Sequence, residues 1–178
     1  MRLLSLWEPW ATLMAIGAKR IETRSWATKY RGWMAIHASK GGLNKGELKS
    51  VLDDQDIRRA LGWKDSWIPF EALCADLKPG HIVAVTRLVD CRPTEDFIPR
   101  RGSRGGYTNT CPILTPEEEA LGDYSAGRFG WVTESRFRLP EPIPYKAAQG
   151  LRTIPDESVL NELRRQFQAL KETEAVQV

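Results

Sequence analysis

The feature that most constrains the fold of this sequence is the nearly continuous apolar run Ile82–Val89, which follows the turn signal Lys78-Pro79-Gly80. An apolar run of this length, bounded by a turn, is typical of a strand buried at the centre of a sheet. We therefore expect Ile82–Val89 to be the central strand on which the other strands are arranged.

Further strands are predicted before and after this run. Apolar or alternating segments predict strands at Met1–Leu6, Ile21–Trp26, Gly32–Ser39 and Arg128–Thr133. The segment Arg138–Pro144 contains three prolines, which exclude a helix and a central strand, so we expect an extended edge there.

Helices are expected between and after these strands. Helical patterns or start signals occur at Pro9–Ala18, in pieces of Asn44–Leu77, from Thr115 onward and at Asp156–Leu170. Because the helices fall between strands without a βαβ rhythm, the sequence predicts an α+β domain around a small mixed β-barrel flanked by helices.

The length of 178 residues fits one domain with its own core. We expect this domain to span residues 1–155, with residues 156–178 forming an amphipathic C-terminal helix packed on it. The last residues, Glu172–Val178, are expected to fray.

Composition narrows the class of protein. No apolar run approaches the roughly 20 residues of a membrane span, so no membrane partner is expected. Cys74, Cys91 and Cys111 are odd in number and widely spaced, which supports neither disulfides nor a zinc site. We expect a cytoplasmic monomer with no metal and no cofactor.

Charge and aromatic residues both concentrate in the N-terminal part. Residues 1–40 hold seven Lys/Arg against two Glu and four of the seven Trp, whereas residues 156–178 hold three Lys/Arg against five Asp/Glu. Cations interleaved with indoles suit a single nucleic-acid strand, since cations neutralise phosphates and rings stack on bases. The alternative is that these Trp side chains belong to the core.

A second cationic segment lies at residues 98–112. It carries Arg100, Arg101 and Arg104 among Gly and Ser residues and no acidic residue, so we expect a mobile loop. Such a loop can close over a phosphate backbone. Its alternative is a solvated insertion with no specific function.

An ordered series of short motifs resembles the ASCH-domain family. The series is LSLWEPW at residues 4–10, GAKRIETRSW at 17–26, YRG at 30–32, IHAS at 36–39, GRFGWV at 127–132, EPIPYK at 141–146 and QGL at 149–151. The resemblance covers roughly residues 3–155. It implies a PUA-like β-barrel, with a cleft beside the Lys19–Arg24 segment.

The resemblance implies nucleic-acid chemistry but leaves the activity open, because the family includes a coactivator domain thought to bind nucleic acid, an amidohydrolase acting on N4-acetylcytidine and a member described as a ribonuclease. Fold alone does not decide between them. The residues expected to contact a nucleic acid or base are Trp7, Pro9, Trp10, Lys19, Glu22, Arg24, Trp26, Arg31, His37, Ser39, Arg100, Arg101, Arg104, Arg128 and Lys146.

Strand alternation places Glu22, Arg24 and Trp26 on one face. The Glu22 carboxylate can accept hydrogen bonds from an exocyclic amine or act as a general base, and the Arg24 guanidinium suits phosphate or guanine. Lys19 can reach a phosphate or polarise a carbonyl. Their alternatives are a Glu22–Arg24 ion pair within the strand and, for Lys19, an ordinary cation at a helix C-terminus.

One position departs from the amidohydrolase members. Glu22 occupies the place of their nucleophilic threonine, and Thr23 points to the opposite face of the strand. We therefore expect binding of RNA, single-stranded nucleic acid or a modified base. The alternatives are a metal-independent hydrolase of RNA or of a modified nucleoside, with Lys19 and Glu22 as catalytic residues, and a protein-interaction domain.

Overall fold

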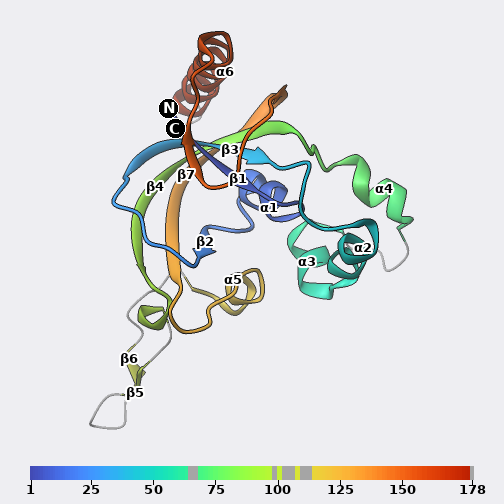
Figure 1. Cartoon of the computed structure of the whole chain (residues 1–178), viewed down its shortest axis with the longest axis vertical. Coiled ribbons are helices and arrows are strands. Elements are labelled where there is room, and N and C mark those ends of the chain that lie inside the picture. The colour runs from blue at the N-terminus through green and yellow to red at the C-terminus, as the bar shows by residue number, and fades with distance from the viewer. Residues whose placement is uncertain (64–67, 98–99, 102–106, 109–113, 177–178) are drawn as a thin grey trace.

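A strongly curved mixed sheet forms the centre of the protein (Figure 1). The computed structural model describes residues 1–63, 68–97, 100–101, 107–108 and 114–176, with backbone only at 100–101, 107–108 and 174–176. The six strands follow the order β2-β7-β4-β3-β1-β8. They span Arg2–Leu6 (β1), Ile21–Arg24 (β2), Gly32–Ala38 (β3), His81–Pro93 (β4), Phe129–Pro144 (β7) and Leu151–Thr153 (β8).

The sheet combines parallel and antiparallel neighbours. β1 runs parallel to β3, whereas β3 with β4, β4 with β7, β7 with β2 and β1 with β8 are antiparallel. Three register shifts interrupt the long β4–β7 ladder, and such bulges bend a sheet. The result is the predicted α+β class, with the sheet rolled into a half-barrel.

The apolar run at Ile82–Val89 lies in β4, which is paired on both sides, as predicted. The predicted strand at Arg128–Thr133 and the proline-rich edge are one continuous strand, β7. β7 pairs with β2 only through residues 129–132, so its proline-bearing half pairs with β4 alone. A proline nitrogen facing away from a ladder costs no hydrogen bond, which is why both parts join in one strand.

Helix α1 (Trp10–Ile16) fills the hollow of the half-barrel. Its Ala11, Met14 and Ala15 pack in the same buried cluster as Met34 of β3 and Trp131 of β7. The helix ends at Gly17, whose φ of 82° is the left-handed conformation that glycine adopts without strain.

Three short helices form a separate lobe beside α1 (Figure 1). They are α2 (Lys45–Asp53), α3 (Gln55–Ala60) and α4 (Phe70–Ala75). The lobe has its own apolar cluster, in which Leu52, Ile57 and Leu73 pack with Leu13 of α1 and with Leu121. Leu121 follows helix α5 (Pro116–Ala120), so this cluster joins the lobe to both helices.

The C-terminal helix α6 spans Glu157–Val176 and packs on β7. Leu160 and Leu163 are buried, and the Gln166 side chain exchanges hydrogen bonds with the backbone of Glu141. The helix continues past Leu170, where the sequence pattern predicts its end. The Gln168 side-chain amide donates a hydrogen bond to the Glu172 carboxylate one turn later, which stabilises this last part of the helix on its exposed face.

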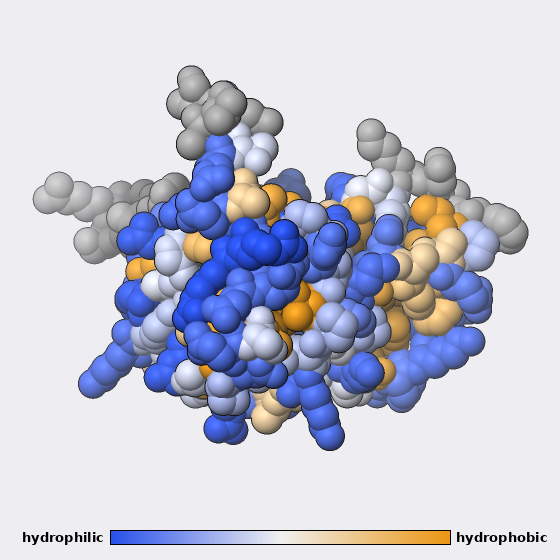
Figure 2. Space-filling model, turned by 90° about the horizontal axis from the view of Figure 1, so that it is seen from above, coloured by the Kyte–Doolittle hydropathy of each residue, from blue (hydrophilic) through white to orange (hydrophobic). Residues whose placement is uncertain are grey.

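The surface is predominantly polar on the face shown in Figure 2, where apolar residues gather only in small patches. In the portion of the chain that the structure describes, no helix combines the length and apolarity needed to cross a membrane.

Candidate nucleic-acid-binding cleft

A cleft of about 730 Å³ lies between the half-barrel and the helical lobe. The barrel side contributes residues of β1 and β2, and the opposite side contributes α2, α3 and the residues after α5. The lining consists of Ser5, Leu6, Trp7, Trp10, Lys19, Glu22, Thr23, Arg24, Ser50, Val51, Asp54, Ile57, Ala120, Leu121, Gly122, Asp123, Arg128 and Gln149.

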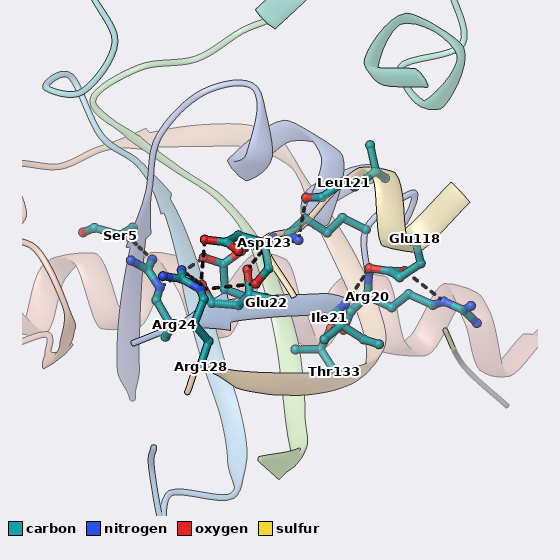
Figure 3. Close-up of polar contacts among 12 residues, drawn as sticks. Ser5, Arg20, Ile21, Glu22, Arg24, Glu118, Leu121, Asp123, Arg128 and Thr133 are labelled. Atoms are coloured by element: carbon teal, nitrogen blue, oxygen red, sulfur yellow. Dashed lines mark hydrogen bonds and ion pairs between the residues drawn. The ribbon is translucent and has the colours of Figure 1, made fainter. Parts of the chain in front are cut away.

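Glu22 of β2 stands between two cations in this cleft (Figure 3). Its carboxylate lies 3.8 Å from the Lys19 Nζ and 3.1 Å from the Arg24 Nε. The Arg24 guanidinium also donates a hydrogen bond of 2.9 Å to the Ser5 carbonyl of β1. Arg24 therefore links the two strands that face each other across the opening of the half-barrel.

Lys19 is almost fully buried, with 1% of its surface exposed. Its ammonium donates to the Leu121 carbonyl at 2.9 Å. Burial lowers the pKa of Lys19, and the carboxylates of Glu22 and Glu118 act against this shift. Lys19 is thus a desolvated amine held at the cleft wall, whereas an ordinary cation at a helix end is solvated.

Glu118 of α5 fixes the backbone that carries Lys19. This buried carboxylate accepts the N–H groups of Arg20 and Ile21 at 2.9 Å, and the Arg20 Nε lies 3.6 Å away. The first turn of α5 therefore caps the start of β2 (Figure 3). The position of Lys19 and Glu22 depends on this contact between segments nearly 100 residues apart in sequence.

Arg128 lies at the far end of β2. Its guanidinium donates to the carbonyls of Thr23 at 3.3 Å and Asp123 at 3.2 Å, and pairs with the Asp123 carboxylate at 3.2 Å. The Thr23 hydroxyl accepts the N–H of Asp123 at 3.1 Å. Thr23 nevertheless lines the same cleft as Glu22 and Arg24, so the expectation that strand alternation keeps it away from the site is wrong. Its hydroxyl is engaged with the backbone after α5.

Two indoles wall the cleft. Trp7 is 43% exposed, and the backbone of Gly42 lies so close to its ring that a Cβ there would approach within 2.5 Å. Trp10 is half-buried. The backbone at Gly42 therefore packs directly against the Trp7 ring, at a distance that only glycine allows. This contact holds the ring in place.

Trp26 lies outside the lining, although alternation along the strand placed it with Glu22 and Arg24. β2 ends at Arg24, so the alternation stops before Trp26. The Trp26 ring packs edge-on against the Trp131 ring, with 4.6 Å between the ring centroids. The backbone carbonyl of Trp26 accepts a hydrogen bond from the Trp131 indole N–H. It nevertheless keeps 38% of its surface exposed.

Several other predicted contact residues also lie outside the lining. His37 is 2% exposed, and its ring nitrogens lie 3.2 Å from the Ser5 Oγ and 3.0 Å from the Tyr145 carbonyl. Burial lowers the pKa of His37. Such a histidine has a structural role, because its polar atoms are already paired within the core. The remaining predicted residues outside the lining are Pro9, which is buried, and Arg31, Ser39 and Lys146.

The predicted cationic loop is described in part. The backbone of Arg100–Arg101 (β5) pairs antiparallel with Tyr107–Thr108 (β6) in a two-stranded ribbon. Arg104 lies outside the described residues. The expectation that these arginines close over a phosphate backbone stays a prediction.

Sequence reasoning missed one wall of the cleft. Ser50, Val51, Asp54 and Ile57 come from α2 and α3, in a segment where the sequence pattern indicates no chemistry. Asp123 and Gln149 were missed as well. These residues carry no motif, and only the docking of the lobe beside α1 brings them opposite β2.

The ionised groups of the lining are balanced. Lys19, Arg24 and Arg128 face Glu22, Asp54 and Asp123 in the same cleft. Paired charges of this kind offer both donors and acceptors, which suits the edge of a heterocyclic base better than a bare phosphate chain. Within the described residues, no group of three or more His, Cys, Asp or Glu side chains could hold a metal ion.

The fold and the cleft define a small α+β half-barrel with an indole-walled cleft that holds paired charges. The chain belongs to the ASCH-domain family, whose sequence pattern matches residues 4–100. Activating signal cointegrator 1 from Homo sapiens is 34% identical over 94 residues, and its counterpart from Mus musculus is 33% identical. The alignments cover 53% of this chain and 15% of each relative.

Proposed function

We propose that this protein binds single-stranded nucleic acid, RNA in the first place, by taking one base into the cleft beside β2. The observation that carries the proposal is the Glu22 carboxylate, held between Lys19 and Arg24 in a cleft walled by the exposed indole of Trp7. A volume of about 730 Å³ is in the range of small-molecule sites.

The chemistry of Glu22 supports a base as ligand. Each oxygen of an ionised carboxylate has two lone pairs, and the flanking cations face one oxygen each. The remaining lone pairs can accept an exocyclic amine. The indole of Trp7 offers a stacking surface, which is worth roughly 1–3 kcal/mol per base.

Membership of the ASCH-domain family is consistent with this proposal but does not carry it, since the alignments cover only 15% of each relative. The free thiols of Cys74 and Cys91 fit a reducing compartment, and we propose a cytoplasmic monomer.

The test is fluorescence anisotropy with labelled single-stranded RNA and DNA hexamers and a matching duplex. Trp7→Ala should weaken single-strand binding by about 5- to 150-fold, the equivalent of one lost stacking contact. Trp26→Ala is the matched control, because this exposed indole lies outside the cleft, and it should change the affinity less than twofold. Absence of single-strand binding at low salt, or equal losses in both variants, would contradict the proposal.

A second candidate function is metal-independent hydrolysis of RNA or of an acylated nucleoside. The observation favouring it is the desolvated Lys19 amine, with its lowered pKa, 3.8 Å from Glu22. Lys19 would stabilise a developing oxyanion, and Glu22 would activate a water. Turnover of RNA or N4-acetylcytidine that disappears in both Lys19→Ala and Glu22→Gln supports it, and turnover that survives both changes excludes it.

A further inference from the structure

A second pocket lies on the edge of the sheet beside β8. Its volume is about 310 Å³, and it is lined by Leu3, Tyr145, Lys146, Ala147, Ala148, Arg152 and Thr153. β8 is an edge strand, paired with β1 only, so the pocket opens where the sheet ends.

The charge of this pocket differs from that of the cleft. All three cations of the cleft are paired with carboxylates, whereas Lys146 and Arg152 form no ion pair with any described residue. The sequence between residues 142 and 155 contains no acidic residue. The pocket therefore carries uncompensated positive charge, which a phosphate would neutralise.

The Arg152 side chain is oriented by the loop next to it. Its Nε donates to the Gln149 carbonyl at 3.1 Å, while its terminal nitrogens have no partner among the described residues. A guanidinium fixed through Nε presents its free N–H groups in a plane, which is the geometry that phosphate oxygens prefer.

The pocket and the cleft lie on either side of the turn at residues 145–150. Gln149 lines the cleft and Ala148 lines the pocket. The Ser5 side chain, which belongs to the cleft lining, donates to the Ala148 carbonyl at 3.0 Å. Leu3 and Ser5 are two residues apart on β1, which separates their positions by about 7 Å.

We propose that the pocket formed by Lys146, Arg152 and Thr153 is a phosphate subsite for the nucleic-acid strand whose base occupies the cleft. The inference rests on the proposed function and adds to it which part of the ligand each of the two sites binds. The balanced cleft takes the base, and the cationic pocket takes a neighbouring backbone phosphate. Its ligand is an oligonucleotide phosphate, so a free nucleoside gains nothing from it.

The test compares two ligands, a labelled single-stranded RNA hexamer and an unphosphorylated nucleoside whose binding is followed by quenching of the protein's tryptophan fluorescence. Lys146→Gln and Arg152→Gln should each weaken hexamer binding by roughly tenfold. Each should also reduce the slope of log affinity against log salt by about 0.7, the contribution of one phosphate contact on a single strand. Nucleoside affinity should stay unchanged.

Two further variants separate phosphate binding from a structural effect. Arg138→Gln removes an exposed cation on β7, outside both pockets, and should leave hexamer affinity within twofold of the wild type. Arg152→Lys keeps the charge but loses the planar fork and the Nε contact to Gln149, so it should keep the wild-type salt slope and bind the hexamer with an affinity between those of the wild type and Arg152→Gln. An Arg152→Lys variant whose salt slope falls as far as that of Arg152→Gln would overturn the phosphate role.

The outcomes distinguish this inference from the function on which it rests. A wild type that binds the hexamer, with Lys146→Gln and Arg152→Gln as tight as wild type, refutes the subsite and leaves base binding in place. A wild type that binds no oligonucleotide refutes both. Competition by polyglutamate at the hexamer's own affinity would show an unspecific anion site, and would overturn the assignment to nucleic acid.

Discussion

At the scale of single residues, the cleft depends on how three neighbouring ionised groups share their environment. Lys19 is buried and Glu22 nearly so, whereas Arg24 reaches the opening and binds the Ser5 carbonyl. A buried ion pair costs desolvation, and it persists where geometry and added hydrogen bonds offset that cost. Here the Leu121 carbonyl and the Ser5 carbonyl supply those hydrogen bonds.

Replacing Glu22 with Gln should lower the pKa of Lys19 further. Burial already lowers this pKa, and the Glu22 carboxylate is the largest influence that raises it. Removing the carboxylate should lower it further, as expected for loss of a close charge partner. As the pH is raised, the ammonium of the variant therefore loses its proton earlier than that of the wild type. Any binding that requires the ammonium should then weaken at a lower pH than in the wild type.

The measurement is an NMR titration of the Lys19 side chain. Asp123→Asn is the control, since Asp123 lines the same cleft and is not among the charges that influence Lys19. Equal shifts in both variants, or a raised pKa in Glu22→Gln, would show that the pairing is not the controlling interaction.

At the scale of elements, the contact between α5 and β2 sets the shape of the site. Glu118 receives N–H groups from Arg20 and Ile21 that have no strand partner at the start of β2. Leu121 follows the same helix. Its carbonyl accepts a hydrogen bond from the Lys19 ammonium, and its side chain packs in the apolar cluster of the helical lobe. One short helix therefore joins the barrel wall, the lysine and the helical lobe.

Glu118→Gln should destabilise the fold by about 2 kcal/mol, because an amide NH2 group would face backbone donors in a buried place. It should also weaken binding in the cleft, since the start of β2 loses its anchor. Urea unfolding measures the first effect and anisotropy the second. Glu119→Gln, an exposed neighbour on the same helix, should change neither. A fully stable Glu118→Gln variant would show that β2 is held by its pairing with β7 alone.

At the scale of the whole molecule, two of the apolar clusters stabilise different parts of the structure. One joins α1 and the lobe to the cleft side, and the other packs α6 on β7, with Leu163 fully buried and Phe167 against Trp33. No residue of the α6 cluster lines the cleft, whereas Leu3, Tyr145 and Ala147 of that cluster line the pocket beside β8. Stability contributed by α6 should therefore be separable from base binding in the cleft.

Leu163→Ala should lower the free energy of unfolding by about 3 kcal/mol through lost burial and the cavity left behind. The affinity of the folded protein for an unphosphorylated nucleoside, which occupies the cleft alone, should stay within twofold of the wild type. Denaturant midpoints and nucleoside titrations on the same samples check both statements, with the exposed Gln168→Ala as the control. A large loss of affinity in folded Leu163→Ala would mean that α6 is coupled to the cleft.

Much of the element map could be predicted from local pattern. The central strand, the strands at Ile21–Arg24 and Gly32–Ala38, the helix before Gly17 and the amphipathic C-terminal helix all follow from periodicity and from Gly and Pro positions. The shared face of Glu22 and Arg24 could also be predicted, since it needs only strand alternation within β2. Lys19 precedes the strand, and its contact with the Leu121 carbonyl does not follow from alternation.

The rest of the site depends on contacts that no local pattern encodes. The lobe wall with Ser50 and Asp54, the anchoring of β2 by Glu118 and the exclusion of Trp26 and His37 from the cleft arise from packing between distant segments. The pocket that holds Lys146 and Arg152, two cations without an ion-pair partner among the described residues, also arises from packing between distant segments. The sequence alone determined where strands and helices form, because alternation and capping act over a few residues. Which side chains meet in the cleft was decided only by the tertiary structure, because burial and ion pairing act between elements that the chain brings together from far apart.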